Sequence, residues 1–319
     1  MKPTILLTGK NGQVGRELSG FLPVLGDVTA LDREQLDLTK PEDIRTAVRT
    51  LRPVLIVNAA AYTAVDQAET DETTARAINT EAPALLAEEA NKIGAALVHY
   101  STDYVFDGTK STPYDEDDPP NPQNVYGRTK LEGERAIQQS GVPHLIFRTA
   151  WVYATQGRNF LLKLLRLATE HEELRIVHDQ IGAPTLSWEI ARATTDILAQ
   201  MYGRESDQIS FPEISGLYHL TAAGETSWYE FATAILQEAA ETRPGTTWFR
   251  AATNNSPLIT RRVIPISTKE YPTPACRPAY SVLSNARLMR TFGRHLPDWR
   301  AQLHSIFAEC SPGSSRIGR

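Results

Sequence analysis

The stretch Thr4-Ile5-Leu6-Leu7-Thr8-Gly9-Lys10-Asn11-Gly12-Gln13-Val14-Gly15 decides the fold class. It begins with a short apolar run, typical of a buried parallel strand, and predicts that a helix starts within the glycine-spaced segment. In such a turn the first glycine permits the tight bend, the second lets a pyrophosphate approach the backbone, and the third lets the helix pack on the strand. The stretch therefore predicts a dinucleotide-binding turn, although a glycine triplet alone also fits a turn without a ligand.

Strand and helix patterns alternate through the rest of the first half of the chain. Strands are predicted at 28–30, 54–57, 95–100 and 144–147, and helices at 41–51, 73–93 and 124–140. This alternation predicts an α/β fold, a Rossmann-like, doubly wound parallel sheet covered by helices on both faces.

The second half is less regular and predicts a smaller C-terminal substrate lobe. Its helical patterns lie at 158–170, 187–202 and 226–241, between turns that contain proline and glycine. We expect an NAD(P)-binding domain at 1–155, to which parts of 175–225 return, and a mainly substrate-binding lobe at 156–310. The composition of 311–319 is that of a mobile tail.

The composition is that of an ordinary globular protein. Of 319 residues, 41% are hydrophobic and 22% charged, and the formal net charge is −5, which excludes wholesale disorder and disfavours nucleic acid as a partner. No apolar run is long enough for a membrane helix, and the amino terminus lacks the layout of a signal peptide. Its two cysteines make no disulfide framework and have no partners at metal-ligand spacing, so the predicted location is the cytoplasm.

The residues after the second strand bear on the choice of cofactor. Asp32 ends that strand, and its carboxylate can accept hydrogen bonds from the adenosine ribose. Its neighbour Arg33 can instead pair with a 2′-phosphate, so NADPH and NADH both remain open. Asp37, with Leu38 beside it, lies near the expected adenine edge, but Asp37 equally fits a surface turn.

Tyr126 and Lys130 stand four residues apart in a predicted helix, and this spacing puts both side chains on one face. An unperturbed tyrosine, with a pKa of about 10, is a poor acid at neutral pH. A nearby ammonium favours the phenolate, which lowers the tyrosine pKa and makes Tyr126 a usable general acid. The same spacing also fits a tyrosine that covers the core beside a surface lysine.

Ser101, Thr102 and Asp103 follow the strand at 95–100, so their side chains are expected at the carboxyl end of the sheet, where doubly wound folds bind ligands. There Thr102 can donate a hydrogen bond to a substrate oxygen while Tyr126 protonates it, which stabilises the developing negative charge. Alone, this triplet is an ordinary strand-end turn. Joined to the glycine turn and the Tyr–Lys pair, it favours a reductase site.

These motifs resemble the extended short-chain dehydrogenases/reductases and, more narrowly, the dTDP-4-dehydrorhamnose reductase family. The glycine turn and the Tyr–Lys pair are common to the whole superfamily, whereas the strings at 101–108 and 179–185 are more particular. The matching stretches are GKNGQVG (9–15), VNAAAYTAVD (57–66), STDYVFDG (101–108), VYGRTKLEGE (125–134), FRTAWVY (147–153), DQIGAPT (179–185), GLYHL (216–220) and YPTPA (271–275).

The resemblance implies a reaction and a set of site residues. Thr102, Tyr126 and Lys130 would be catalytic in an NADPH-dependent reduction of the C4 carbonyl of a dTDP-4-dehydrorhamnose, with NADH possible. Trp151 would lie against the sugar, Arg277 could pair with the nucleotide diphosphate, and Asp103 would contact the substrate. The expected cofactor-binding residues are Gly9, Asn11, Gly12, Gln13, Val14, Gly15, Asp32, Arg33, Asp37, Leu38, Ala60, Ala61, Tyr62, Thr63, Tyr126 and Lys130.

The resemblance also has departures and competitors. Some family members carry Mg²⁺ at a carboxylate-built dimer contact; Glu17 matches one position there, but the stretch after Pro184 does not supply the rest, so metal and homodimer stay open. A 4,6-dehydratase needs a Glu after the Asp, where this chain has Tyr104. A 4-epimerase, another keto-sugar reductase and a non-catalytic regulatory subunit, like that of methionine adenosyltransferase, remain as alternatives.

Overall fold

A computed structural model describes residues 2–201, 214–241 and 246–308. Its centre is a sheet of six parallel strands in the order β10-β5-β4-β3-β1-β2. The strands are β1 (Thr4–Thr8), β2 (Asp27–Leu31), β3 (Leu55–Asn58), β4 (Ala96–Thr102), β5 (His144–Thr149) and β10 (Gly216–His219). The predicted strands are therefore confirmed, with ends that shift by one or a few residues.

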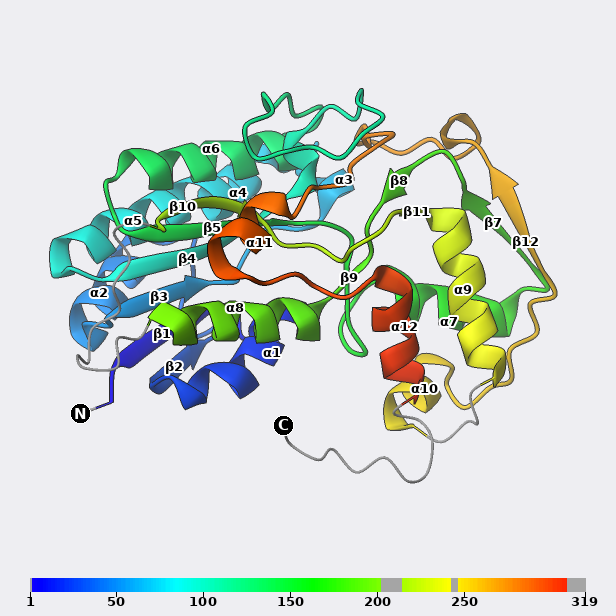
Figure 1. The fold of residues 1–319 in the computed structure, drawn as a ribbon, viewed down its shortest axis with the longest axis horizontal. Coiled ribbons are helices and arrows are strands. Elements are labelled where there is room, and N and C mark those ends of the chain that lie inside the picture. The colour runs from blue at the N-terminus through cyan, green and yellow to red at the C-terminus, as the bar shows by residue number, and fades with distance from the viewer. Residues whose placement is uncertain (1, 202–213, 242–245, 309–319) are drawn as a thin grey trace.

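Helices cover both faces of this sheet, as the alternation predicted (Figure 1). One face packs on α1 (Gln13–Phe21) and α8 (Ser187–Met201), and the other on α2 (Pro41–Leu51), α5 (Ala82–Ile93) and α6 (Val125–Gln139). Strand β1 shows why both faces are apolar: Ile5 and Leu7 belong to one core and Leu6 to the other, because successive side chains alternate. The fold is a Rossmann-like, doubly wound α/β fold.

The predicted helix at 73–93 is one continuous rod made of three pieces. They are α4 (Glu72–Arg76), a π-helical turn η2 (Ala77–Glu81) and α5. The ends of other helices follow from side-chain caps that the apolar pattern does not show. Asn124 accepts from the amide of Gly127 at the start of α6, and Asn159 accepts from that of Leu162 at the start of α7 (Phe160–Glu170).

A second lobe lies beside the carboxyl edge of the sheet (Figure 1). Its apolar core joins α7, α9 (Trp228–Glu241) and α12 (Trp299–Ala308), and the parallel strands β7 (Glu173–Val177) and β12 (Arg262–Ile266) flank it. Shorter elements are η1 (Leu22–Val24), α3 (Val65–Ala68), η3 (Asp103–Val105), β6 (Val152–Tyr153), β8 (Ile181–Gly182), β9 (Thr185–Leu186), β11 (Thr226–Ser227), α10 (Thr247–Ala252), η4 (Thr268–Glu270) and α11 (Ala286–Phe292).

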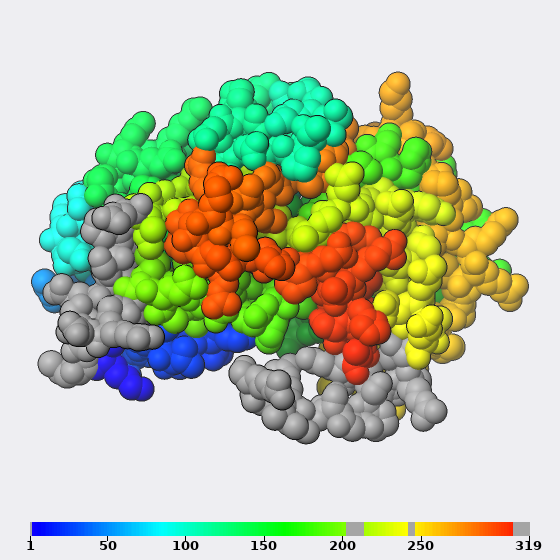
Figure 2. Space-filling view, viewed as in Figure 1, coloured from blue at the N-terminus to red at the C-terminus, as the bar shows by residue number. Residues whose placement is uncertain are grey.

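The chain passes between the two parts more than once. Strand β10 pairs with β5 at the edge of the central sheet, and α11 packs beside β10. Figure 2 shows the orange segment that contains α11 seated on the first part before the red α12 rejoins the second. Within the described ranges no helix is both long and apolar enough to cross a membrane. The tail predicted at 311–319 lies outside the described residues.

Candidate active site

The glycine turn connects β1 to α1 in a conformation that excludes larger side chains. Gly9 has a φ of +75°, and a Cβ there would lie 2.7 Å from the amide nitrogen of Ala60. A Cβ on Gly15 would lie 2.1 Å from the carbonyl oxygen of Gly9, so this glycine lets the helix pack on the turn. Gly12 is the N-cap of α1 and has no side chain that could cap the helix, which leaves the first amides open to an anion.

A cleft runs along the carboxyl edge of the sheet as two overlapping cavities. One has a volume of about 500 Å³ and reaches from Gly9 past Asp37 to Ile78, and the other, of about 480 Å³, reaches from Gly9 to Tyr126. Every predicted cofactor residue except Gly15 lines one cavity or both. The residues shared by the two are Gly9, Asp32, Arg33, Ala60, Ala61 and Thr63.

The acidic residue at the end of β2 is already engaged within the protein. Asp32 accepts hydrogen bonds from Asn11 Nδ2 at 3.2 Å and from the amide of Glu34 at 3.1 Å, and it pairs with Lys10 at 3.3 Å. Arg33 is exposed and lines both cavities. The carboxylate expected to bind a ribose is thus partly neutralised, whereas the neighbouring guanidinium is presented to the cleft.

Tyr126 lines the second cavity, and Thr102 lies beside it at the end of β4. A side-chain hydrogen bond links the two hydroxyls, and Thr102 also donates to Asp103 at 3.0 Å. Withdrawal from water raises the pKa of Tyr126 to about 12, an effect that the Thr102 hydrogen bond opposes and the Asp103 charge reinforces. Burial likewise raises the pKa of Asp103 to about 6, against hydrogen bonds from Ser281 and Thr102.

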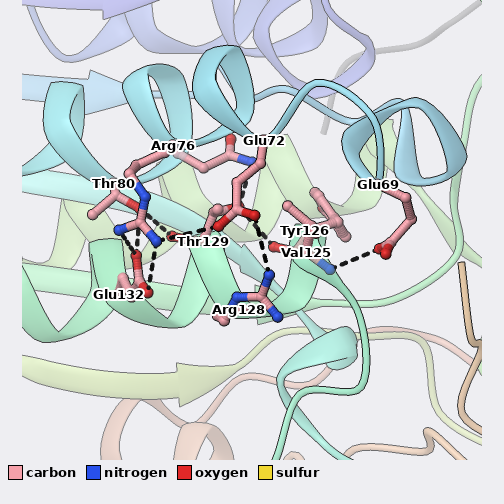
Figure 3. Close-up of polar contacts among 10 residues, drawn as sticks. Glu69, Glu72, Arg76, Thr80, Val125, Tyr126, Arg128, Thr129 and Glu132 are labelled. Carbon is pink, nitrogen blue, oxygen red and sulfur yellow. Dashed lines mark hydrogen bonds and ion pairs between the residues drawn. The ribbon is translucent and has the colours of Figure 1, made fainter.

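The first turn of α6, which carries Tyr126, is fixed from outside the helix (Figure 3). The amide of Val125 donates to the carboxylate of Glu69 at 2.8 Å, and within the helix Thr129 donates back to the Tyr126 carbonyl at 3.0 Å. Further along, Arg76 of α4 pairs with Glu132 at 2.5 Å. These contacts hold the start of α6 and tie the helix to α4.

Lys130 is where the structure departs from the prediction. It lies on the same face of α6 as Tyr126, but its Nζ donates to the Tyr100 carbonyl at 2.6 Å and lies 3.0 Å from His99 Nε2. Burial lowers the pKa of Lys130 to about 8, with Glu134 opposing the change. The expected lowering of the Tyr126 pKa by an adjacent ammonium is therefore wrong for this arrangement, because the lysine points to β4.

Two predicted substrate residues are held by partners that the sequence did not reveal. Trp151 stacks on Trp228 of α9, with ring centroids 3.6 Å apart. Arg277 donates to Asp66 Oδ2 at 2.8 Å and to the Ala275 carbonyl at 3.3 Å, so its predicted pairing with a diphosphate would have to compete with Asp66.

Other cleft residues escaped the sequence analysis. Gly157 and Arg158, which come from the loop before α7, line the second cavity together with Thr149 and Val152. The loop is tied to the glycine turn, since Asn159 Nδ2 donates to Gln13 Oε1 at 3.0 Å and Gln13 donates to the Val152 carbonyl at 3.3 Å. No sequence signal links these segments, which lie more than a hundred positions apart in the chain.

The cleft offers anion-binding amides, hydroxyls and cations, but the described ranges 2–201, 214–241 and 246–308 hold no cluster of three or more His, Cys, Asp or Glu residues suited to a metal ion.

A parallel sheet with a glycine turn and a Thr–Tyr–Lys set at its carboxyl edge defines an NAD(P)-dependent oxidoreductase of the short-chain dehydrogenase/reductase class. A family model described as the RmlD substrate binding domain matches residues 1–311. The chain belongs to this family.

Named relatives agree with the assignment. The chain is 51% identical over 296 residues to a dTDP-4-dehydrorhamnose reductase of Burkholderia thailandensis, covering 93% of this chain and 95% of the relative. It is 41% identical to the Escherichia coli enzyme of the same name, covering 96% and 97%. A crystal structure of dTDP-4-dehydrorhamnose reductase from Bacillus anthracis in complex with NADP superposes with a TM-score of 0.83 at 33% identity, covering 97% of this chain and 100% of that one.

Proposed function

We propose that this protein reduces the C4 carbonyl of dTDP-4-dehydro-L-rhamnose to the alcohol of dTDP-L-rhamnose, with NADPH as the hydride donor. The observation that carries the proposal is the pair of Thr102 and Tyr126 hydroxyls, whose tyrosine lines the same cavity as the glycine turn. The names of the relatives supply the sugar. Asp103 is followed by Tyr104 instead of a second carboxylate, which fits a reduction and not a dehydration.

The residues of the cleft fit a dinucleotide. Gly12 lines the cleft without a Cβ, so the backbone can approach a pyrophosphate, and the open amides at the start of α1 favour its charge. Ala60, Ala61 and Thr63 line the middle of the cleft. Arg33 lines the cleft, where its guanidinium would pair with a 2′-phosphate, and this is our reason for preferring NADPH to NADH.

Side chains of the protein supply the proton for the reduction. NADPH, when bound, supplies the hydride for C4. Tyr126 holds a proton on its Oη, because its raised pKa keeps the phenol neutral, and it passes that proton to the C4 oxygen as negative charge develops there. The single hydroxyl proton of Thr102 is donated to Asp103 in this structure, and it can turn to Tyr126 Oη as the tyrosine loses its proton, which stabilises the phenolate left behind.

The test is the decay of NADPH absorbance with dTDP-4-dehydro-L-rhamnose, beside reactions with NADH and without sugar. Sugar-dependent oxidation, with one dTDP-L-rhamnose formed for each NADPH consumed, is the expected result. Redox-neutral conversion of a nucleotide sugar would replace the proposal by a 4-epimerase. Binding of cofactor and sugar without any turnover would replace it by the regulatory role.

The remaining expectations concern the location of the protein in the cell and its oligomeric state. We place the reaction in the cytoplasm, with a nucleotide sugar as its partner and a homodimer as a possible state. Light scattering with and without added Mg²⁺ measures the assembly directly. A mass near 35.4 kDa under both conditions would remove the dimer, and a mass that doubles only with Mg²⁺ would establish the metal contact.

A further inference from the structure

The loop before α7 brings an arginine to the cofactor cleft. Arg158 is exposed and lines the second cavity, which Gly9, Gly12 and Gln13 of the glycine turn also line. Among the residues that the structure describes, none forms a hydrogen bond or an ion pair with the Arg158 side chain. A cation that lines a cavity and has no partner within those residues is available to an anionic ligand.

Arg158 and Arg33 line different stretches of the cleft. Arg33 lines both cavities, and the first cavity continues to Asp37, near the expected adenine edge. Arg158 lines the second cavity and not the first, and Val152 lines the second cavity with it. Because NADPH carries negative charge in two places, at its 2′-phosphate and at its pyrophosphate, the two arginines are available to two different groups.

Contacts on both sides of Arg158 tie its loop to α1. On one side, Arg16 of α1 donates a hydrogen bond to Gln156 Oε1. On the other side, Asn159 Nδ2 donates to Gln13 Oε1 at 3.0 Å, and Gln13 is the first residue of α1. The loop is therefore anchored to the beginning of this helix both before and after the arginine.

The residue before the arginine brings the loop close to the helix. Gly157 has a φ of +84°, a conformation that glycine adopts readily, and a Cβ there would lie 3.7 Å from Gln13 Cγ. The backbone beside Arg158 is thus within contact distance of the residue whose amide is among the first of α1.

The start of α1 is where a pyrophosphate is expected to bind. The amides that follow Gly12 are open, but a helix N-terminus supplies only a partial positive charge. A pyrophosphate carries negative charge on both of its phosphates. An arginine supplies a full charge and paired donors that match two phosphate oxygens, so Arg158 offers what the amides lack.

We propose that Arg158 binds the pyrophosphate of the nicotinamide dinucleotide, together with the open amides at the start of α1. The inference rests on the proposed function in taking a nicotinamide dinucleotide as the ligand of the cleft. It goes beyond the predicted cofactor residues, because it assigns the pyrophosphate a guanidinium from the loop before α7. This contact serves NADPH and NADH alike, whereas a contact from Arg33 to the 2′-phosphate serves NADPH alone.

The proposed sugar nucleotide also contains a diphosphate, which an arginine would recognise by the same chemistry. The cofactor is favoured because Arg158 lines one cavity with Gly9, Gly12 and Gln13, and because its loop is anchored on Gln13 itself. The test therefore includes dTDP, which carries the diphosphate of the sugar nucleotide without the sugar.

Arg158→Gln removes the charge and keeps a polar side chain. Arg158 is exposed and makes no contact within the described residues that the fold would lose, so the Tm of the variant should match that of the natural protein. Arg158→Lys keeps the charge but not the paired donors. Arg166→Gln is the matched control, because Arg166 lies on α7, pairs with Glu170 at 3.3 Å and lines neither cavity of the cleft.

Isothermal titration calorimetry of the full chain with NADP⁺, NAD⁺ and dTDP, each added alone, measures the three Kd values. In Arg158→Gln we expect the Kd of NADP⁺ and that of NAD⁺ to rise together by about tenfold, as the loss of a charged hydrogen bond requires. The Kd of dTDP should not change. Arg158→Lys should lie between Arg158→Gln and the natural protein, and Arg166→Gln should match the natural protein.

Other patterns overturn the proposal. A rise for NADP⁺ alone would assign Arg158 to the 2′-phosphate, and a rise for dTDP alone would assign it to the sugar nucleotide. An equal rise for all three ligands would indicate a general effect of charge. Losses as large in Arg158→Lys as in Arg158→Gln would indicate a displaced loop, and unchanged Kd values would leave Arg158 without a role in binding.

These titrations need no turnover, so they separate the inference from the proposed reaction. If Arg158→Gln weakens both dinucleotides as expected but the natural protein oxidises no NADPH with the sugar nucleotide, the reductase activity fails and the role of Arg158 stands. If the natural protein is an active reductase and Arg158→Gln binds both dinucleotides as tightly as it does, the inference alone fails.

Discussion

Trp151 lies flat on Trp228, with ring centroids 3.6 Å apart and ring planes 4° apart. Trp151 follows β5 at the carboxyl edge of the sheet, whereas Trp228 begins α9 in the second lobe, so the stack joins the two parts of the molecule. Gly182 leaves room for Trp151, since a Cβ there would lie 2.4 Å from the indole. The backbone of Trp151 has a φ of +47°, a value that a residue other than glycine keeps only when its surroundings fix it. One face of Trp151, the residue predicted to lie against the sugar, is therefore covered by a contact between the two lobes.

Trp228→Ala tests whether this stack organises the sugar site. We expect the KM for the sugar nucleotide to rise about tenfold, because an aromatic pair of this kind contributes about 0.5–1.5 kcal/mol beyond its buried area. The Kd of NADPH should stay within about twofold, since Trp228 lies outside both cavities of the cofactor cleft. Trp248→Ala, in the core of the same lobe, is the control, and an equal rise in KM there would assign the effect to general loosening.

Tyr126→Phe tests the proton donor. Loss of a general acid should lower kcat about 10²–10⁴-fold, while the Kd of NADPH measured by fluorescence changes little. Tyr104→Phe is the matched control, because its ring packs edge-on against Tyr126 with centroids 5.6 Å apart and yet donates no proton in the proposed reaction. A Tyr126→Phe enzyme that loses binding and rate together would argue against the acid role. Lys130→Ala should weaken NADPH binding and also lower kcat.

The sequence predicted what is local and missed what the sheet assembles. Gly9, Gly12 and Gly15 lie within one turn, and their spacing between a strand and a helix predicted a dinucleotide-binding turn. The spacing of four residues likewise predicted that Tyr126 and Lys130 share one face of a helix. The direction of the lysine depends instead on His99, which the β4 strand brings to it. Nothing in the helix pattern contains that information.

Pairs between distant segments were likewise beyond the sequence. Asp66 and Arg277 are joined by a 2.8 Å hydrogen bond across 211 positions, and Trp151 and Trp228 meet only because the second lobe folds back on the sheet. Their residue types predicted ligand contacts, an arginine for a phosphate and an aromatic face for a sugar. The tertiary structure supplies each with a partner inside the protein.

Arg33→Gln tests the choice between the two nicotinamide cofactors. A hydrogen bond to a charged group contributes about 1.5–3 kcal/mol, so losing it should raise the KM for NADPH about 10- to 100-fold and leave that for NADH nearly unchanged. Arg45→Gln on α2, which pairs with Glu42 away from the cleft, is the matched control. Equal losses with both cofactors in Arg33→Gln would mean that Arg33 contributes only general charge.

Asp103→Asn tests a pH dependence of stability. Burial raises the pKa of Asp103 from 3.8 to about 6, so the folded protein binds this proton more tightly than the unfolded chain does. The stability linked to this group is therefore fully present below about pH 4 and is lost as the pH rises through 6. The asparagine variant avoids that loss. Its free energy of unfolding in urea should exceed that of the natural protein by roughly 2–3 kcal/mol at pH 7.5 and by little at pH 4.

Asp107→Asn should show the opposite sign and makes the comparison specific. The backbone amide of Thr109 is the main cause that lowers the pKa of Asp107 to about 2, so its ionised form stabilises the fold above the unfolded pKa and loses that effect as the pH falls. Asp107→Asn should therefore destabilise the protein at pH 7.5 and by nearly as much at pH 4, with the difference disappearing as the pH falls toward 2. If both variants shift stability in the same direction at pH 7.5, the charge of Asp103 is not what burial opposes, and a hydrogen bond lost from Thr102 or Ser281 becomes the explanation.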